Sequence, residues 1–160
     1  MGVPKKKEKS DDKFTEKNIF QISLTKDIIQ NDLNIKTNSP PKISKDQLIK
    51  QAFILHAQGN LKEAAKYYQY FIDQGFKDPR VLSNYGVVCR QQGIDEKARK
   101  LYLISIKQYP NFSDAYSNLG YLLKEKGELN QALEYTKKAI ELNPTDFESY
   151  INLGSIFNNL

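Results

Sequence analysis

The sequence of 160 residues predicts an all-α fold made of stacked antiparallel helix pairs. The first observation behind this class is a set of small residues and prolines that recur every 34 positions: Gly86, Gly120 and Gly154; Gly59, Gly93 and Gly127; Ala64, Ala98 and Ala132; Pro110 and Pro144. The second is that apolar residues between them recur at three- and four-residue steps, which is the spacing of one helix face. Self-similarity at a fixed period of this length is the signature of a repeat architecture.

The unit that starts at Ser113 shows the pattern most clearly. Its first segment has one apolar stripe, formed by Ala115, Leu119, Leu122 and Leu123. Gly127 should end this helix, because glycine readily adopts the left-handed conformation that follows many helices. A second stripe follows, formed by Leu129, Ala132, Leu133, Ala139, Ile140 and Leu142. Pro144 ends it, since the residue before a proline is pushed out of helical geometry. Each unit is therefore predicted to be two short antiparallel helices.

Glycine inside a helix needs an explanation, because it costs about 1 kcal/mol relative to alanine. Gly120 lies on the first helix of its unit and Ala132 on the second, each where the other helix is expected to cross. Small residues at a crossing let the two backbones approach closely. We therefore interpret these positions as packing positions without chemical function.

Helix pairs with this period and with small residues in these two places resemble the tetratricopeptide repeat. The resemblance covers residues 45–160 and implies a right-handed solenoid of about three and a half repeats. Its units are residues 45–78, 79–112 and 113–146, followed by the first helix of an incomplete repeat at 147–160. The first unit is looser, because Ala52 replaces the first glycine and Phe76 replaces the proline.

Residues 1–44 do not follow the repeat. They carry nine lysines against six acidic residues and end near Ser39-Pro40-Pro41-Lys42, which indicates a stiff hinge before the array. We expect a basic and mostly disordered leader. The alternative is that its apolar patch, between Phe20 and Leu33, docks on the array.

No catalytic, metal or cofactor site is expected. His56 is the single histidine, has no partner at metal-ligand spacing and should be partly exposed, whereas Cys89 lies on an inner stripe and should be buried. The tyrosines fall mostly on packing stripes and do not alternate with a basic face, so nucleic-acid binding is not expected either. Without a secretory signal or an apolar run long enough to span a membrane, and with one cysteine, the chain is expected to be cytoplasmic.

The resemblance implies that the first helices line a concave groove, which in this family takes an extended peptide or a partner's helix. The candidate binding residues lie on the outward stripes of these helices: Lys50, Phe53, Asn84, Val87, Arg90, Asn118, Tyr121, Lys124 and Asn152. The same stripes also contain Ile49, His56, Ser83, Gln91, Ser117, Ile151, Ser155 and Asn159. With Arg90 and Lys124 in the groove, we expect an acidic or neutral peptide.

Asn84, Asn118 and Asn152 recur once per repeat. A side-chain amide has donors and an acceptor, so a row of amides could hold a peptide backbone. The row is similar to the asparagine ladder in the superhelical arm of O-linked N-acetylglucosamine transferases. The alternative is that these side chains bond to neighbouring helices and support packing.

Chaperone-binding members of the family hold a C-terminal carboxylate with Lys and Asn on the first unit's inner face. This chain has Ile49 and Phe53 at those positions, which argues against that partner class.

Two functions are compatible with the sequence. The first is a non-catalytic interaction scaffold. The second is the substrate-recruiting arm of a larger glycosyltransferase- or sulfotransferase-type protein, because the chain is similar to the N-terminal parts of multi-repeat proteins of marine picocyanobacteria. The unfinished last repeat should leave Leu153 and Phe157 exposed, and self-association through this end is possible.

Overall fold

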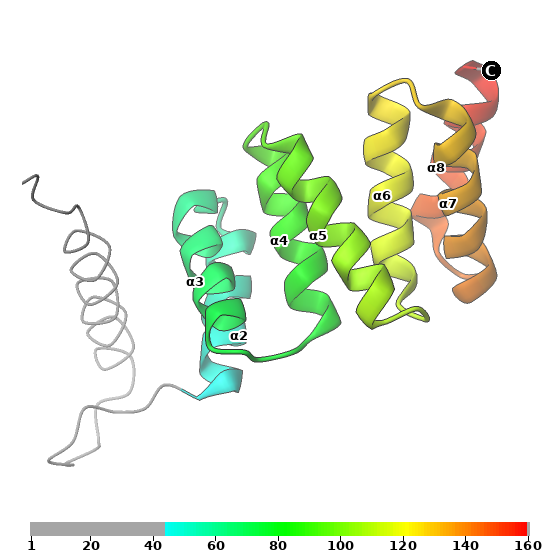
Figure 1. Cartoon of the computed structure of the whole chain (residues 1–160). Coiled ribbons are helices and arrows are strands. Elements are labelled where there is room, and N and C mark those ends of the chain that lie inside the picture. The colour runs from blue at the N-terminus through cyan, green and yellow to red at the C-terminus, as the bar shows by residue number, and fades with distance from the viewer. Residues whose placement is uncertain (1–43, 160) are drawn as a thin grey trace, which may run out of the picture. The chain divides into compact units, whose positions relative to one another are not determined.

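The computed structural model describes residues 44–159, which form helices and no strand (Figure 1). The helices in this part of the chain are α2 (Lys45–Ala57), α3 (Leu61–Asp73), α4 (Pro79–Gln91), α5 (Asp95–Gln108), α6 (Ser113–Glu125), α7 (Leu129–Leu142) and α8 (Phe147–Asn159). Helices α2, α4, α6 and α8 begin 34 residues apart. The predicted all-α array of helix pairs is thus confirmed. The proposed leader, with its docking patch, lies outside the described residues.

The helices pack in sequential pairs. Within each repeat, α2 packs on α3, α4 on α5 and α6 on α7, and each second helix also contacts the first helix of the next repeat. In addition, α4 contacts α6, and α6 contacts α8. Helices α3 to α7 therefore bury their apolar stripes between their own partner and an adjacent repeat, as a solenoid requires.

The glycine that ends α6 adopts the predicted left-handed conformation. Gly127 has a φ of 75°. Its N–H donates to the carbonyl of Lys124 at 3.0 Å, and the N–H of Glu128 donates to the carbonyl of Leu123 at 2.9 Å. These bonds satisfy carbonyls that the end of the helix would otherwise leave unpaired. The tight turn into α7 follows from this local geometry.

The glycines inside the first helices mark close helix crossings, as predicted. A methyl group built on Gly120 would lie 3.2 Å from the backbone nitrogen of Thr136 and 3.3 Å from the carbonyl oxygen of Ala132, both on α7. On Gly86 it would overlap the buried ring of Tyr102 on α5, whose Cδ1 would be only 2.7 Å away. At Gly120 the lack of a side chain lets the two backbones approach closely, and at Gly86 it makes room for the Tyr102 ring.

The core of the described array is rich in aromatic side chains, with Tyr68, Phe71 and Tyr102 fully buried. Cys89 is also buried, as predicted, and burial raises the pKa of its thiol. A thiol of this kind is poorly ionised at neutral pH and therefore a weak nucleophile.

Helix α8 is buried on one side only. Ser149, Asn152 and Ile156 face the preceding repeat. The opposite side exposes Phe147, Tyr150, Ile151 and Phe157 by 73%, 48%, 54% and 55%. The predicted exposure of Phe157 is confirmed. The prediction for Leu153 was wrong: this side chain is half-buried, because α8 packs against both α6 and α7.

None of the helices between residues 44 and 159 is long and apolar enough to cross a membrane.

Candidate peptide-binding face

The first helices of the repeats, α2, α4, α6 and α8, together present the side chains that the sequence singled out. We call this surface the first-helix face and define it by Lys50, Phe53, Asn84, Val87, Arg90, Asn118, Tyr121, Lys124 and Asn152. Lys50 is exposed, Asn152 is buried and the other seven are half-buried. Ile49 and Ser83, also expected on the outward stripes, are buried instead and belong to the packing between helices.

Each asparagine of the recurring row already has a partner within the array. Asn84 Nδ2 donates to the carbonyl of Arg80 on its own helix at 2.8 Å. Asn118 Nδ2 donates to Ser83 Oγ on α4 at 2.9 Å, and Asn152 Oδ1 accepts from Lys124 Nζ at 3.3 Å. Each of these bonds uses only part of an amide, which has two N–H donors and one carbonyl acceptor. The bonds of Asn118 and Asn152 join adjacent repeats, whereas that of Asn84 stays within α4. Asn84 and Asn118, which are half-buried, keep hydrogen-bonding groups for a ligand, whereas Asn152 is buried.

Two cations from adjacent repeats meet over one tyrosine ring. The Arg90 guanidinium lies 4.6 Å from the centroid of the Tyr121 ring, and Lys124 Nζ lies 4.4 Å from the same centroid. Both separations are within the range of cation–π attraction. Glu125 also takes part: its carboxylate is 3.4 Å from Arg90 Nη1, and its hydrogen bond to Tyr121 raises the pKa of that phenol. We call Arg90, Tyr121, Lys124 and Glu125 the cation–tyrosine cluster.

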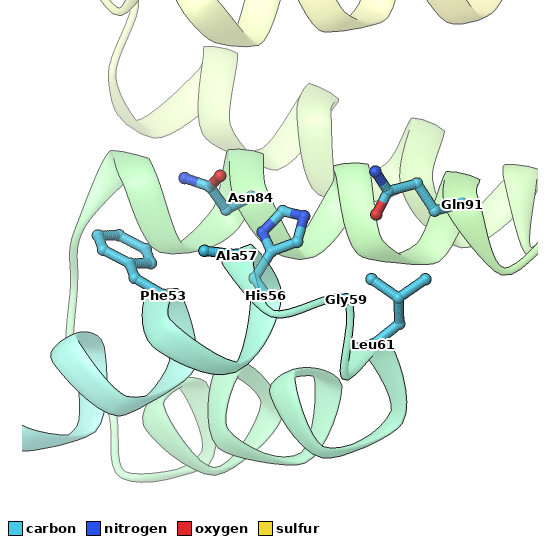
Figure 2. Close-up of a pocket in the computed structure, with 7 residues that line it drawn as sticks. All are labelled: Phe53, His56, Ala57, Gly59, Leu61, Asn84 and Gln91. Atoms are coloured by element: carbon cyan, nitrogen blue, oxygen red, sulfur yellow. The ribbon is translucent and has the colours of Figure 1, made fainter.

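A hollow of about 550 Å³ lies between α2 and α4. Figure 2 shows Phe53 and His56 on α2 beside Asn84 and Gln91 on α4, with Leu61 at the start of α3. The complete lining is Phe53, His56, Ala57, Gly59, Leu61, Asn84 and Gln91. The hollow therefore combines an apolar floor with two amides and one imidazole at its margin.

His56 is the titratable group of this hollow. It is half-buried, as predicted, and its Nδ1 lies 3.3 Å from the Tyr68 hydroxyl in a hydrogen bond. Burial lowers the pKa of His56, and a hydrogen bond with Gln91 partly opposes this shift. The imidazole is thus predominantly neutral at neutral pH.

The structure brings five of the nine predicted residues together in two groups, and Lys50, Val87, Asn118 and Asn152 belong to neither. Phe53 and Asn84 line the hollow, whereas Arg90, Tyr121 and Lys124 form the cluster. The hollow itself was missed by sequence reasoning. The available signal was the looser first repeat, in which α2 departs from the pattern of the others.

Models of one protein family match the chain in two places. One tetratricopeptide repeat model matches residues 54–111 and another matches residues 113–146. Together the two matches span more than half of the chain. A search of curated proteins found no match.

Solved structures of tetratricopeptide repeat domains share the fold. The first such domain of Spaghetti (RPAP3), bound to an HSP90 peptide SRMEEVD, has a TM-score of 0.67 at 20% identity, covering 71% of this chain and 90% of that one. The Sgt2 domain from Aspergillus fumigatus has a TM-score of 0.68 at 22% identity, with coverages of 74% and 80%. The second domain of human RPAP3, in complex with an HSP70 peptide SGPTIEEVD, has a TM-score of 0.63 at 19% identity, with coverages of 69% and 92%.

The repeat period, the close helix crossings at glycine and the two family matches agree with one another. The chain belongs to the tetratricopeptide repeat family.

Proposed function

We propose that this protein is a non-catalytic interaction scaffold that binds an extended peptide segment of a partner protein along the first-helix face. The observation that carries the proposal is the composition of this face: an apolar hollow, a row of amides and a cation–tyrosine cluster on consecutive first helices. An extended peptide presents side chains and backbone amides at regular intervals along its length. Each repeat of this face contributes side chains that could contact them.

Two structures of similar fold support the proposal. Domains of RPAP3 hold the peptides SRMEEVD and SGPTIEEVD. These domains match 71% and 69% of this chain in fold but are only 20% and 19% identical to it in sequence. They support peptide binding as a use of this architecture. Which peptide this chain binds depends on the side chains of its own first-helix face. The same face would serve a free-standing scaffold and the recruiting arm of a larger protein.

The test begins with selection of binding peptides from a displayed random library on the full chain. We expect the combined change Asn84→Ala, Asn118→Ala and Asn152→Ala to weaken a selected peptide by about tenfold or more, since each lost hydrogen bond contributes about 0.5–1.5 kcal/mol. Isothermal titration calorimetry gives the affinities, and circular dichroism verifies that the helices are retained.

The matched control is Ser83→Ala. This change removes the internal partner of Asn118 without altering the first-helix face. If Ser83→Ala weakens the peptide as much as the triple variant does, the row acts through packing. Failure to select any peptide would contradict the proposed function itself.

A further inference from the structure

His56 joins the first two helices of the array. It lies on α2, and its Nδ1 is 3.3 Å from the hydroxyl oxygen of Tyr68 on α3. The two rings meet edge to face, with centroids 6.2 Å apart and planes at 87°. Tyr68 is fully buried, so its hydroxyl needs a partner within the protein. A neutral imidazole with its proton on Nε2 supplies one, because Nδ1 then accepts the hydroxyl proton.

Tyr68 also connects the first repeat to the second. Its ring stacks on that of Tyr85 on α4, with centroids 5.8 Å apart and planes at 29°. The Tyr85 hydroxyl donates to Gln69 Oε1 at 3.1 Å and accepts from Lys97 Nζ on α5. A chain of contacts therefore runs from His56 through α3 and α4 to α5. A change at the imidazole acts directly on the junction of the two repeats.

The hollow that His56 borders has no carboxylate in its lining. The lining from α2 and the start of α3 is apolar, and α4 contributes the neutral amides of Asn84 and Gln91. On α3, the titratable group that faces the imidazole is Tyr68, and burial raises the pKa of this phenol, which stays neutral. A proton on His56 would therefore meet no compensating negative charge in this hollow.

Three cations lie on the helices that border the hollow. The Arg80 guanidinium on α4 lies 5.8 Å from the centroid of the Phe53 ring and is held in an ion pair. Lys62 on α3 lines an adjoining hollow. Arg90 on α4 belongs to the cation–tyrosine cluster with α6. None of these groups can compensate a positive charge on His56, and burial of the imidazole lowers its pKa as well.

Protonation reverses the role of Nδ1. Both nitrogens of an imidazolium are donors, so the Tyr68 hydroxyl loses its acceptor. A buried donor without an acceptor and a charge without a partner are both unfavourable. Both are relieved when α2 moves away from the junction and the imidazole reaches water.

We propose that His56 is a pH switch at the junction of the first and second repeats. While neutral, it holds α2 to α3 through the Tyr68 hydroxyl. When protonated, it releases this bond and loosens the first repeat. Arg90 and Lys124 follow at the equivalent positions of the next two repeats, so the switch is confined to the first. Loosening would also weaken a peptide held in the hollow, a consequence that rests on the proposed function.

The chain has a single histidine, so the switch can be titrated directly. Nuclear magnetic resonance of the full chain gives the pKa of His56, which should lie below that of an unfolded histidine, about 6.5. Tyr68→Phe removes the donor that favours the neutral ring and should raise this pKa. Gln91→Ala removes a bond that favours the charged ring and should lower it. A pKa at or above that of unfolded histidine would overturn the switch.

Hydrogen exchange followed by mass spectrometry measures the loosening. The open state binds the proton more tightly, so opening of α2 should become more frequent as the pH falls from about 7.5 to about 5.5, by up to about tenfold if the two pKa values differ by one. His56→Gln cannot titrate and is the matched control. Its exchange in α2, corrected for the intrinsic pH dependence, should not change. Equal changes in the two chains would overturn the proposal.

Peptide binding gives a separate readout. A selected peptide without acidic residues or histidine should bind the wild type less tightly at about pH 5.5 than at about pH 7.5, and should bind His56→Gln equally at both. Equal binding of the wild type at both would overturn the link between the switch and the peptide. Failure to select a peptide would count against the proposed function, whereas the titration and the exchange would still decide the switch.

Discussion

At the scale of single residues, the glycines at one equivalent position of three successive repeats lie in three different environments. Gly86 faces the buried Tyr102 ring, and Gly120 faces the backbone of α7. Gly154, at the equivalent position of α8, has nothing within 4 Å of where a methyl group would lie. Packing therefore requires glycine at this repeat position in α4 and α6. At the same position in α8 it does not.

This contrast predicts opposite effects of one substitution. Gly86→Ala should destabilise the array by about 1–3 kcal/mol, because the added methyl group overlaps a fully buried ring. Gly154→Ala should stabilise it by up to about 1 kcal/mol, because alanine is the better helix former and meets no neighbour. Urea denaturation followed by circular dichroism measures both changes. Equal effects of the two substitutions would contradict the packing role of Gly86.

At the scale of the helix, α8 differs from α4 and α6 in having one apolar side uncovered. Phe147, Ile151 and Phe157 are each more than half exposed. Contiguous apolar surface of this kind is a known mark of interaction sites. The self-association expected from the sequence at this end stays a prediction, and these side chains are its candidate contacts.

The prediction is that the chain associates reversibly and that the double change Ile151→Lys and Phe157→Lys abolishes the association. Two lysines would oppose burial of this surface, because burying a charge without a partner is costly. Sedimentation velocity over a range of concentrations gives the result. Leu103→Lys is the control, since Leu103 is also an exposed apolar side chain, at 41%, but lies on α5. A wild-type chain that sediments as a monomer throughout would contradict the prediction.

At the scale of the whole array, the junctions between repeats differ. The second and third repeats are joined by the paired Arg99–Glu128 bonds, by the Lys126–Asp95 ion pair and by the Asn118–Ser83 bond. At the junction of the first and second repeats, Tyr85 on α4 stacks on Tyr68 and donates to Gln69, both on α3, whereas the hollow lies between α2 and α4. Neighbour contacts largely determine the stability of each unit in a repeat array.

Hydrogen exchange followed by mass spectrometry should therefore show faster exchange in α2 than in α4 and α6. Helix α2 has one neighbouring repeat and a hollow at that junction. Local opening of α2 should therefore cost less free energy than opening of α4 or α6. Exchange in α2 as slow as in α4 would be evidence against this order of stability. It would also favour the alternative in which the leader docks on the array, which deletion of residues 1–41 would then test.

The sequence by itself determined the repeat, the ends of the helices and the residues at the helix crossings. These features depend on local chemistry: the three- and four-residue spacing of apolar side chains, the left-handed conformation of Gly127 and the small size of Gly86 and Gly120. They could be predicted because each is specified within one 34-residue unit. The outward stripe also located most of the candidate face, although it misplaced Ile49 and Ser83, which lie at the edge of the stripe and are buried by the adjacent helix.

Only the tertiary structure decided what the candidate residues do to one another. Three contacts depend on rotamers and on the spacing of helices from different repeats: Arg90 and Lys124 both approach the Tyr121 ring, Asn118 bonds to Ser83, and a hollow lies beside Phe53. Side chains some 30 residues apart in the sequence meet there, and the distance between two stacked helices is set by every side chain packed between them. The physical reason is that a repeat pattern specifies which face a residue occupies, whereas contacts across repeats specify its neighbours.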